Sequence, residues 1–196
     1  WLHDAIRHDG GSGRPDCARN SLAMYELCKR EGRGLNCRFL AQVLNEMYLA
    51  MGFPSRFVTC QSKAYDTDTD CHVINMVWSR QLGKWIWMDA SFAAYVTDEN
   101  GLLLHLGEVR ERLIKGLPLV LNEDANWNHK LKQTKEGYLE NYMAKNLYML
   151  DAHLESRFET EPADGSGSRQ IYLVPEGVWP LSEYATYDDR YFWQAP

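Results

Sequence analysis

Apolar residues spaced three and four apart predict a helix near the start of the chain. It covers residues 17–31, after a loop at residues 8–16 that is rich in glycine. Gly32 and Gly34 end it, because glycine readily leaves helical geometry. The predicted buried stripe of this helix is Ala18, Leu22, Tyr25 and Cys28.

A second helix is predicted to begin near Cys37. Asn36 is suited to cap its N-terminus, which makes Cys37 the first helical residue, and Gly52 and Pro54 end it. One face carries the apolar positions predicted to be buried: Cys37, Leu40, Ala41, Leu44, Met47, Tyr48 and Met51.

Three strands are predicted next, over residues 56–61, 72–78 and 84–89, from β-forming residues and from alternation. The last two flank a turn of hairpin length. If the loop is residues 79–82, His72 lies directly across from Asp89 on the same face. Another loop choice shifts this pairing, so the hairpin supports the juxtaposition without proving it.

The pattern weakens after residue 91. Residues 109–115 and 135–150 are predicted to be helical, residues 163–168 form a Gly/Ser loop, and residues 171–174 form a strand. We expect a core at 1–95 and a C-terminal extension at 96–196 that packs on it, or one single domain overall. Aromatic residues gather near the end of the chain, and packing against the core is favoured over lining a peptide or glycan site: Tyr172, Trp179, Tyr184, Tyr187, Tyr191, Phe192 and Trp193.

Composition excludes several classes of protein. The 196 residues are 45% hydrophobic and 24% charged with a net charge of −6, which is ordinary for a globular domain and unfavourable for binding nucleic acid. No apolar run reaches the roughly 18 residues of a membrane helix. The sequence opens at Trp1 without Met or a signal-peptide pattern, so we expect a trimmed chain and predict no compartment.

Metal and cofactor sites are not predicted. The five cysteines include no C-x-x-C pair and are odd in number, so at least one thiol stays free. His3 and His8 lack partners at metal-binding spacing. Asp66, Asp68 and Asp70 imitate the start of a calcium loop, but Cys71 and Val77 stand where that loop needs Gly and Glu. We interpret this segment as a solvated acidic loop.

Cys37 is the cysteine best suited to act as a nucleophile. An ordinary thiol titrates at about 8.5, and a helix N-terminus or a neighbouring imidazolium lowers that value. His72 opens a predicted strand that can face this helix end, and Asp89 can fix the tautomer of the imidazole. Taken singly, a core cysteine, an ordinary histidine and a turn aspartate are more common. Their order and predicted geometry together favour a catalytic Cys37–His72–Asp89 triad.

Four motifs resemble the transglutaminase-like superfamily. They are GLNCRFLA (34–41), which resembles the nucleophile helix, GFPSR (52–56), a following turn, HVINMVW (72–78), the histidine strand, and KWIWMDAS (84–91), the strand ending in the aspartate. The resemblance implies a papain-like α+β core in which the nucleophile helix packs on an antiparallel sheet. It also implies that Cys37 is the nucleophile, His72 the general base and then acid, and Asp89 the residue that orients His72.

The resemblance implies cysteine-dependent acyl transfer on amide or peptide bonds through a thioester, with a protein, peptide or glycopeptide as substrate. We expect hydrolysis rather than crosslinking, because nothing in residues 34–91 encodes a channel that keeps water out; Trp78, Trp85 and Trp87 are expected to be core residues. A silent binding or structural module is the alternative. The family often has Gly two residues before the nucleophile, where Leu35 stands here, and the side chain that completes the oxyanion hole is not identified from the sequence.

Overall fold

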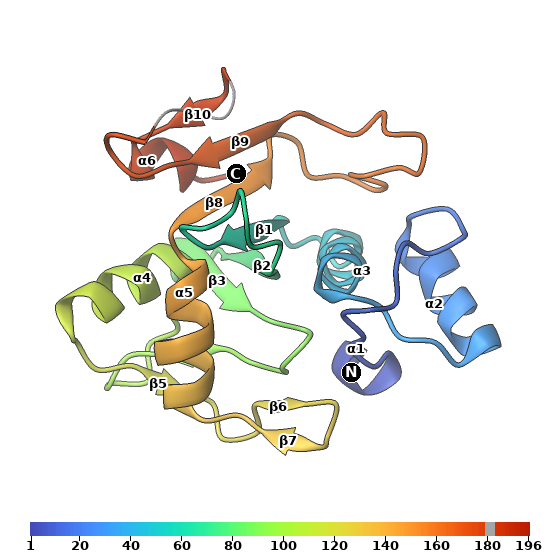
Figure 1. Cartoon of the computed structure of the whole chain (residues 1–196), viewed down its shortest axis with the longest axis horizontal. Helices are drawn as coiled ribbons and strands as arrows, with labels where there is room; N and C mark the ends of the chain where they lie inside the picture. Colours follow the sequence, from blue (N-terminus) through green and yellow to red (C-terminus); the bar gives the residue numbers. More distant parts are fainter. Residues whose placement is uncertain (179–182) are drawn as a thin grey trace.

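The chain folds as an α+β structure in which one sheet lies between two layers of helices (Figure 1). The computed structural model describes residues 1–178 and 183–196. Helix α3 covers one face of the sheet, and α4 and α5 lie on the other side of it (Figure 1). This confirms the predicted fold class.

The main sheet has the strand order β10-β9-β8-β1-β2-β3 among the described residues. Its pairs are antiparallel except for β10 with β9, which are parallel, so the sheet is mixed rather than purely antiparallel as predicted. The strands of this sheet are β1 Ser55–Gln61, β2 Cys71–Ser79, β3 Lys84–Met88, β8 Met149–His153, β9 Gln170–Leu173 and β10 Ala185–Thr186. Two small ribbons pair β4 Val96–Thr97 with β5 Val120–Leu121, and β6 Asn126–Trp127 with β7 Leu131–Lys132.

The helices are capped as their sequences suggest. Asn20 caps the second helix through its side chain, and Asn36 caps the third, as predicted. The helices are α1 Leu2–Ala5, α2 Ser21–Glu31, α3 Cys37–Ala50, α4 Leu106–Lys115, a π-helix at Lys135–Met143, α5 Ala144–Asn146 and α6 Asp189–Phe192.

The buried faces of the first two long helices differ from the predicted stripes. In α2, Met24 and Leu27 are buried beside Cys28, whereas Leu22 is exposed. Met51, just past the end of α3, is exposed, and burial in α3 extends to polar residues because the helix is covered by both the sheet and α2. The buried surface of α3 is wider than the predicted apolar stripe because both the sheet and α2 cover the helix. A single apolar stripe in the sequence does not reveal the second neighbour.

The helix predicted over 135–150 is shorter than expected. The helical segment ends at Asn146, and residues 149 and 150 begin β8. Val58 of β1 pairs with Ala152 of β8, so a partner far away in the sequence draws this segment into the sheet.

The β2–β3 hairpin has a register shifted by two residues from the predicted one. Its ladder runs from Ser79↔Lys84 to Asn75↔Met88, so the loop is 80–83 rather than 79–82. His72 and Asp89 therefore are not a cross-strand pair, and the prediction of direct pairing was wrong. A shift of two keeps every side chain on its predicted face, because side chains alternate with a period of two.

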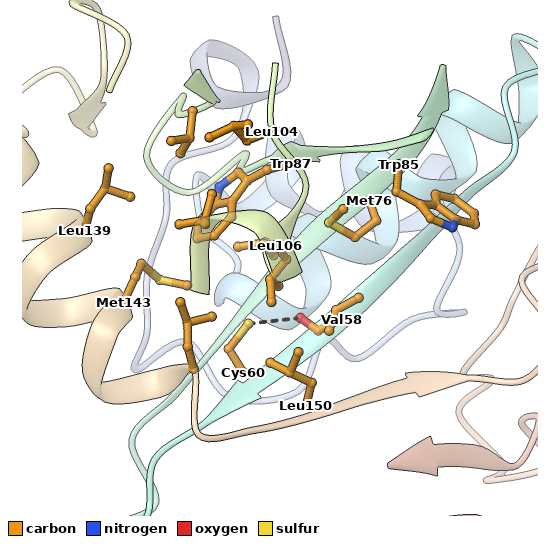
Figure 2. Packing of buried hydrophobic residues seen from close by; sticks show 14 of the residues in the cluster. Val58, Cys60, Met76, Trp85, Trp87, Leu104, Leu106, Leu139, Met143 and Leu150 are labelled. Atoms are coloured by element: carbon orange, nitrogen blue, oxygen red, sulfur yellow. Dashed lines mark hydrogen bonds between the residues drawn. The ribbon is translucent and has the colours of Figure 1, made fainter. Parts of the chain in front are cut away.

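The larger core lies on the sheet face opposite α3 (Figure 2). Trp85 and Trp87 are buried there and Trp78 packs at its margin, in agreement with the expected packing role. From the C-terminal half, Leu139, Met143 and Leu150 complete this core (Figure 2). Strands from both sides of residue 95 share the sheet, and the division into two parts at that residue stays a prediction.

The C-terminal aromatic residues are divided between core and surface. Phe192 is buried and Trp193 packs against the core, while Tyr187 and Tyr191 are exposed. Trp179 lies outside the described residues. Within residues 1–178 and 183–196, no helix combines the length and apolar character needed to cross a membrane.

Candidate active site

Cys37 is the first residue of α3. The Asn36 side chain accepts a hydrogen bond from the backbone N–H of Phe39 at 3.2 Å, which fixes the start of the helix. The backbone N–H of a first helical residue has no acceptor inside its helix. Cys37 is partly exposed and packs beside Ala41 and Val73. Its thiol and its N–H are thus located at the positive end of the helix dipole.

The edge of the sheet gives Cys37 access to His72. β3 pairs with β2 only from Asn75 to Ser79, so the first residues of β2 have no strand beside them on this edge. The Val73 backbone N–H donates to the Cys37 sulfur there, and the His72 side chain is hydrogen-bonded to the same sulfur. Because β3 ends before it reaches this part of β2, the Cys37 thiol can reach His72. The His72 side chain lies on the face of the sheet opposite α3.

Asp89 binds the other side of the imidazole. His72 Nε2 lies 2.6 Å from Asp89 Oδ2, and both side chains are buried. A carboxylate only accepts, so Nε2 carries a proton and Nδ1 is the nitrogen left for Cys37. Asp89 also accepts from the Tyr138 hydroxyl at 2.5 Å and from the Ser91 backbone N–H at 2.7 Å. These hydrogen bonds hold the Asp89 carboxylate beside His72. The register of the β2–β3 hairpin alone would not place it there.

The electrostatics of the cluster favour a thiolate and an imidazolium. Burial raises the pKa of Cys37, but the hydrogen bonds from His72 and His8 outweigh it and lower the pKa to about 6. Burial lowers the pKa of His72, but the Asp89 carboxylate outweighs it and raises the pKa to about 10. Burial also opposes ionisation of Asp89, yet the charge of His72 holds its pKa below the usual range. The lowered pKa of Cys37 and the raised pKa of His72 both favour the thiolate–imidazolium ion pair over the neutral pair.

Aromatic rings enclose His72. The centroids of Phe92 and Tyr142 each lie 5.4 Å from the centroid of the imidazole. Tyr138 and Tyr142 both come from the π-helix, a rare conformation that is often found at functional sites. These rings keep His72 away from bulk water while Cys37 stays partly open.

His8 is a second imidazole at Cys37 that the sequence did not reveal. Its side chain is hydrogen-bonded to the Cys37 sulfur, and its Nδ1 accepts from Trp127 Nε1 at 3.0 Å. In the sequence His8 is a candidate only for a metal ligand, a role for which it lacks partners at the right spacing. Gly34 was the available signal, because its lack of a side chain allows residues 7–9 to approach the start of α3 closely.

The other four cysteines differ in exposure, and the acidic loop is largely exposed. Cys28 and Cys60 are buried, whereas Cys17 and Cys71 are partly exposed, and all five thiols are free. Burial and the neighbouring Cys37 raise the pKa of Cys71 to about 11, so it is a poor nucleophile near neutrality. Asp66 and Asp70 are exposed, in agreement with a solvated loop.

A small polar pocket adjoins the cluster. It has a volume of about 260 Å³ and is lined by Arg38 and Cys71, the residues next to Cys37 and His72, together with the buried carboxyl of Asp151. Burial raises the pKa of Asp151. The larger cavity of about 800 Å³ between α4 and the C-terminal strands contains none of the three predicted catalytic residues.

This fold and cluster define an α+β protein in which one histidine contacts both a cysteine and an aspartate. Residues 1–90 match the model of the transglutaminase-like superfamily, and this segment contains Cys37, His72 and Asp89. The similarity to the transglutaminase-like superfamily thus lies in this core, which is 90 of the 196 residues.

Comparisons with curated proteins and with solved structures give two further results. No curated protein matches the sequence. Among solved structures, the chain is similar to a candidate cysteine protease from Cytophaga hutchinsonii, with 21% identity and a TM-score of 0.35. The similarity covers 53% of this chain and 31% of that one, so the chain spans less than a third of the length of this relative.

Proposed function

We propose that the protein is a cysteine-dependent hydrolase of amide or peptide bonds, with Cys37 as nucleophile, His72 as general base and acid, and Asp89 as the group that orients His72. The observation that carries the proposal is the contact of the thiol of Cys37, a partly exposed residue, with an imidazole whose other nitrogen is bound by a buried carboxylate. Such an arrangement activates a nucleophile and sets the tautomer of its base.

The reaction uses the ion pair described above. The Cys37 thiolate attacks the carbonyl carbon, and the C–O π electrons move to oxygen to give a tetrahedral oxyanion. The oxyanion collapses, the C–N bond breaks, and the His72 imidazolium gives its proton to the departing amine. Water then attacks the thioester while neutral His72 takes its proton. Release of the carboxylic acid restores the thiolate and the imidazolium.

Water is the favoured acceptor of the acyl group. Crosslinking requires an amine to reach the thioester before water does, hence a channel that excludes water. Trp78, Trp85 and Trp87, which could have formed such a wall, belong to the core. Cys37 is a partly exposed residue, and water at about 55 M can reach a thioester formed on it.

The test combines a covalent label with a substrate panel. Iodoacetamide at limiting dose should label Cys37 ahead of the other thiols, and mass spectrometry should detect an acyl group on Cys37 after brief mixing with p-nitrophenyl acetate. Casein and glutamine peptides are then assayed with and without a primary amine. Cleavage or deamidation should exceed incorporation of the amine.

Cys37→Ala should abolish acyl transfer, while Cys71→Ala, at the neighbouring partly exposed cysteine, should retain it. Activity that survives Cys37→Ala would reject the mechanism. Dominant amine incorporation would reject hydrolysis. Equal labelling of all exposed cysteines, unchanged in His72→Ala, would favour the silent binding module.

A further inference from the structure

We infer that His8 is a further catalytic residue: its Nε2–H, together with the backbone N–H of Cys37, binds the oxyanion that forms when Cys37 attacks a carbonyl group. The inference deepens the proposed function and rests on it. It begins from the contact of His8 with the Cys37 sulfur. Three independent features of the structure hold the ring in a single orientation there.

The first feature is the hydrogen bond from Trp127. An indole N–H can only donate, so Nδ1 of His8, 3.0 Å away, must be an acceptor without a proton. The proton of the neutral ring is therefore on Nε2, which leaves that N–H as the group able to donate toward Cys37. The ring also stacks on Phe92, with 6.3 Å between centroids and 30° between planes.

The second feature fixes the backbone of His8 beside the start of α3. His8 forms a parallel bridge with Leu35, in which Asp9 N donates to Leu35 O at 2.8 Å and Leu35 N donates to Arg7 O at 3.2 Å. A Cβ at Gly34 would lie 2.6 Å from Arg7 O, a distance that real contacts do not reach. Gly34 thus allows residues 7–9 to lie close to the residues that lead into Cys37.

The third feature is the turn between β6 and β7. Asn128 and His129 both have positive φ, and Lys130 N donates to Trp127 O at 2.9 Å, which is the form of a type I′ turn. The Asn128 side chain accepts from His8 N at 2.7 Å and donates to His8 O at 2.9 Å. The turn therefore binds both the backbone and the ring of His8 (Figure 1 shows β6 and β7 beside the N-terminal segment).

These constraints suit an oxyanion better than a resting thiolate alone. His72 already bonds the sulfur and supplies the charge of the ion pair. When the sulfur attacks the carbonyl carbon, negative charge moves to the carbonyl oxygen, two bonds from the sulfur. The His8 Nε2–H is neutral and rigidly held, and it lies beside the backbone N–H of Cys37, which has no acceptor inside its helix. Both groups can donate to the oxyanion without moving, which is the property that makes oxyanion donors effective. Trp127 and Asn128 are positioning residues in this arrangement.

The experiment separates stabilisation of the oxyanion from activation of the thiol. His8→Phe removes the donor, His8→Gln keeps an N–H donor, and Trp127→Phe removes only the bond that sets the tautomer. His129→Asn, in the same turn but with an exposed side chain, is the matched control. Three quantities are measured: steady-state hydrolysis of p-nitrophenyl acetate, inhibition by N-acetyl dipeptide aldehydes, and the plateau rate of alkylation by iodoacetamide. The aldehyde forms a hemithioacetal with an oxyanion, whereas alkylation forms none.

We expect His8→Phe to lower kcat by about 100- to 1,000-fold, with KM little changed, and to weaken aldehyde binding by a comparable factor. The plateau alkylation rate should change far less, His8→Gln should recover part of both losses, and His129→Asn should match the wild type. Unchanged kcat and aldehyde affinity in folded His8→Phe would overturn the inference, as would equal losses in aldehyde binding and alkylation. If His8→Phe fails to fold, a Trp127→Phe variant with unaltered kcat and aldehyde affinity would overturn it.

Failure of the proposed function gives a different result. A wild type that binds the aldehydes through Cys37 but cleaves no amide rejects the hydrolase and still tests His8 through the aldehyde affinities. A wild type that neither binds aldehydes nor transfers an acyl group rejects both.

Discussion

Tyr138 donates a hydrogen bond of 2.5 Å to Asp89 Oδ2, the same oxygen that accepts from His72. Tyr138 lies beyond the residues that match the family model, in the π-helix. The candidate site is therefore completed by the C-terminal half of the chain.

Tyr138→Phe should lower the free energy of unfolding by about 1.5–3 kcal/mol, because a buried charged acceptor loses a donor. Urea denaturation measures the change. Tyr142→Phe, on the same helix and half-buried, is the matched control, and we expect it to cost less than about 0.5 kcal/mol. Equal effects of the two variants would show that the bond to Asp89 contributes nothing to stability.

The alkylation rate of Cys37 should rise with pH around a midpoint of about 6, since the thiolate is the reactive species and its pKa is lowered to about 6. In His72→Phe the midpoint should move toward the ordinary thiol value of about 8.5. Cys71, with a pKa raised to about 11, should stay unlabelled at pH 7 and serves as the internal control. Mass spectrometry after timed iodoacetamide pulses measures both. A midpoint near 8.5 in the wild type contradicts the ion pair.

Glu161→Gln should destabilise the protein at neutral pH and lose this effect in acid. Burial alone would raise the pKa of Glu161, but its bonds to His153 and Arg38 outweigh burial and lower the pKa to about 2. A depressed carboxyl pKa contributes stability that is present above about pH 4.5 and is lost as the pH falls through about 2. The full contribution is about 3 kcal/mol.

Urea titrations of the wild type and Glu161→Gln at pH 7, 4 and 2.5 measure this dependence. The exposed Glu155 provides the control variant Glu155→Gln, which should behave as the wild type does. A difference between wild type and Glu161→Gln that is constant with pH would be inconsistent with the role of the carboxylate charge. Since Arg38 follows Cys37, loss of the bond is also expected to loosen the first turn of α3.

Ile74→Ala should cost about 2–5 kcal/mol of unfolding free energy, because Ile74 is fully buried in the core shared by the two halves of the chain. Ile114→Ala, at an isoleucine that is 76% exposed, should cost less than about 0.5 kcal/mol. Thermal and urea unfolding provide the comparison. Similar losses for both variants would contradict the location of the core.

Local sequence signals predicted the parts of the fold that local interactions create. Asn36 marked the start of α3 because capping depends on a few adjacent residues. The π-helix escaped prediction because the apolar period that identifies helices does not distinguish its hydrogen-bond pattern. The hairpin register was wrong because neighbouring loop choices look alike in sequence, although the faces were right.

The residues of the candidate site also fall into two groups: those predicted from the sequence and those missed. Cys37, His72 and Asp89 were predicted together, and the structure brings their side chains into contact; their catalytic roles stay a proposal. His8 and Tyr138 were missed because each is defined by a partner far along the chain, Trp127 for His8 and Asp89 for Tyr138. A single sequence carries no local signal for such contacts.

The pairing of β1 with β8 has a consequence for how the chain folds. Val58 pairs with Ala152, so the inner edge of β1 has no partner until most of the chain has left the ribosome. An apolar strand edge that is open during synthesis is a site for pairing with other chains. Contacts this distant in sequence also slow folding. We expect fragments that stop before residue 149 to aggregate, and chaperones that shield strand edges to raise the yield of folded protein.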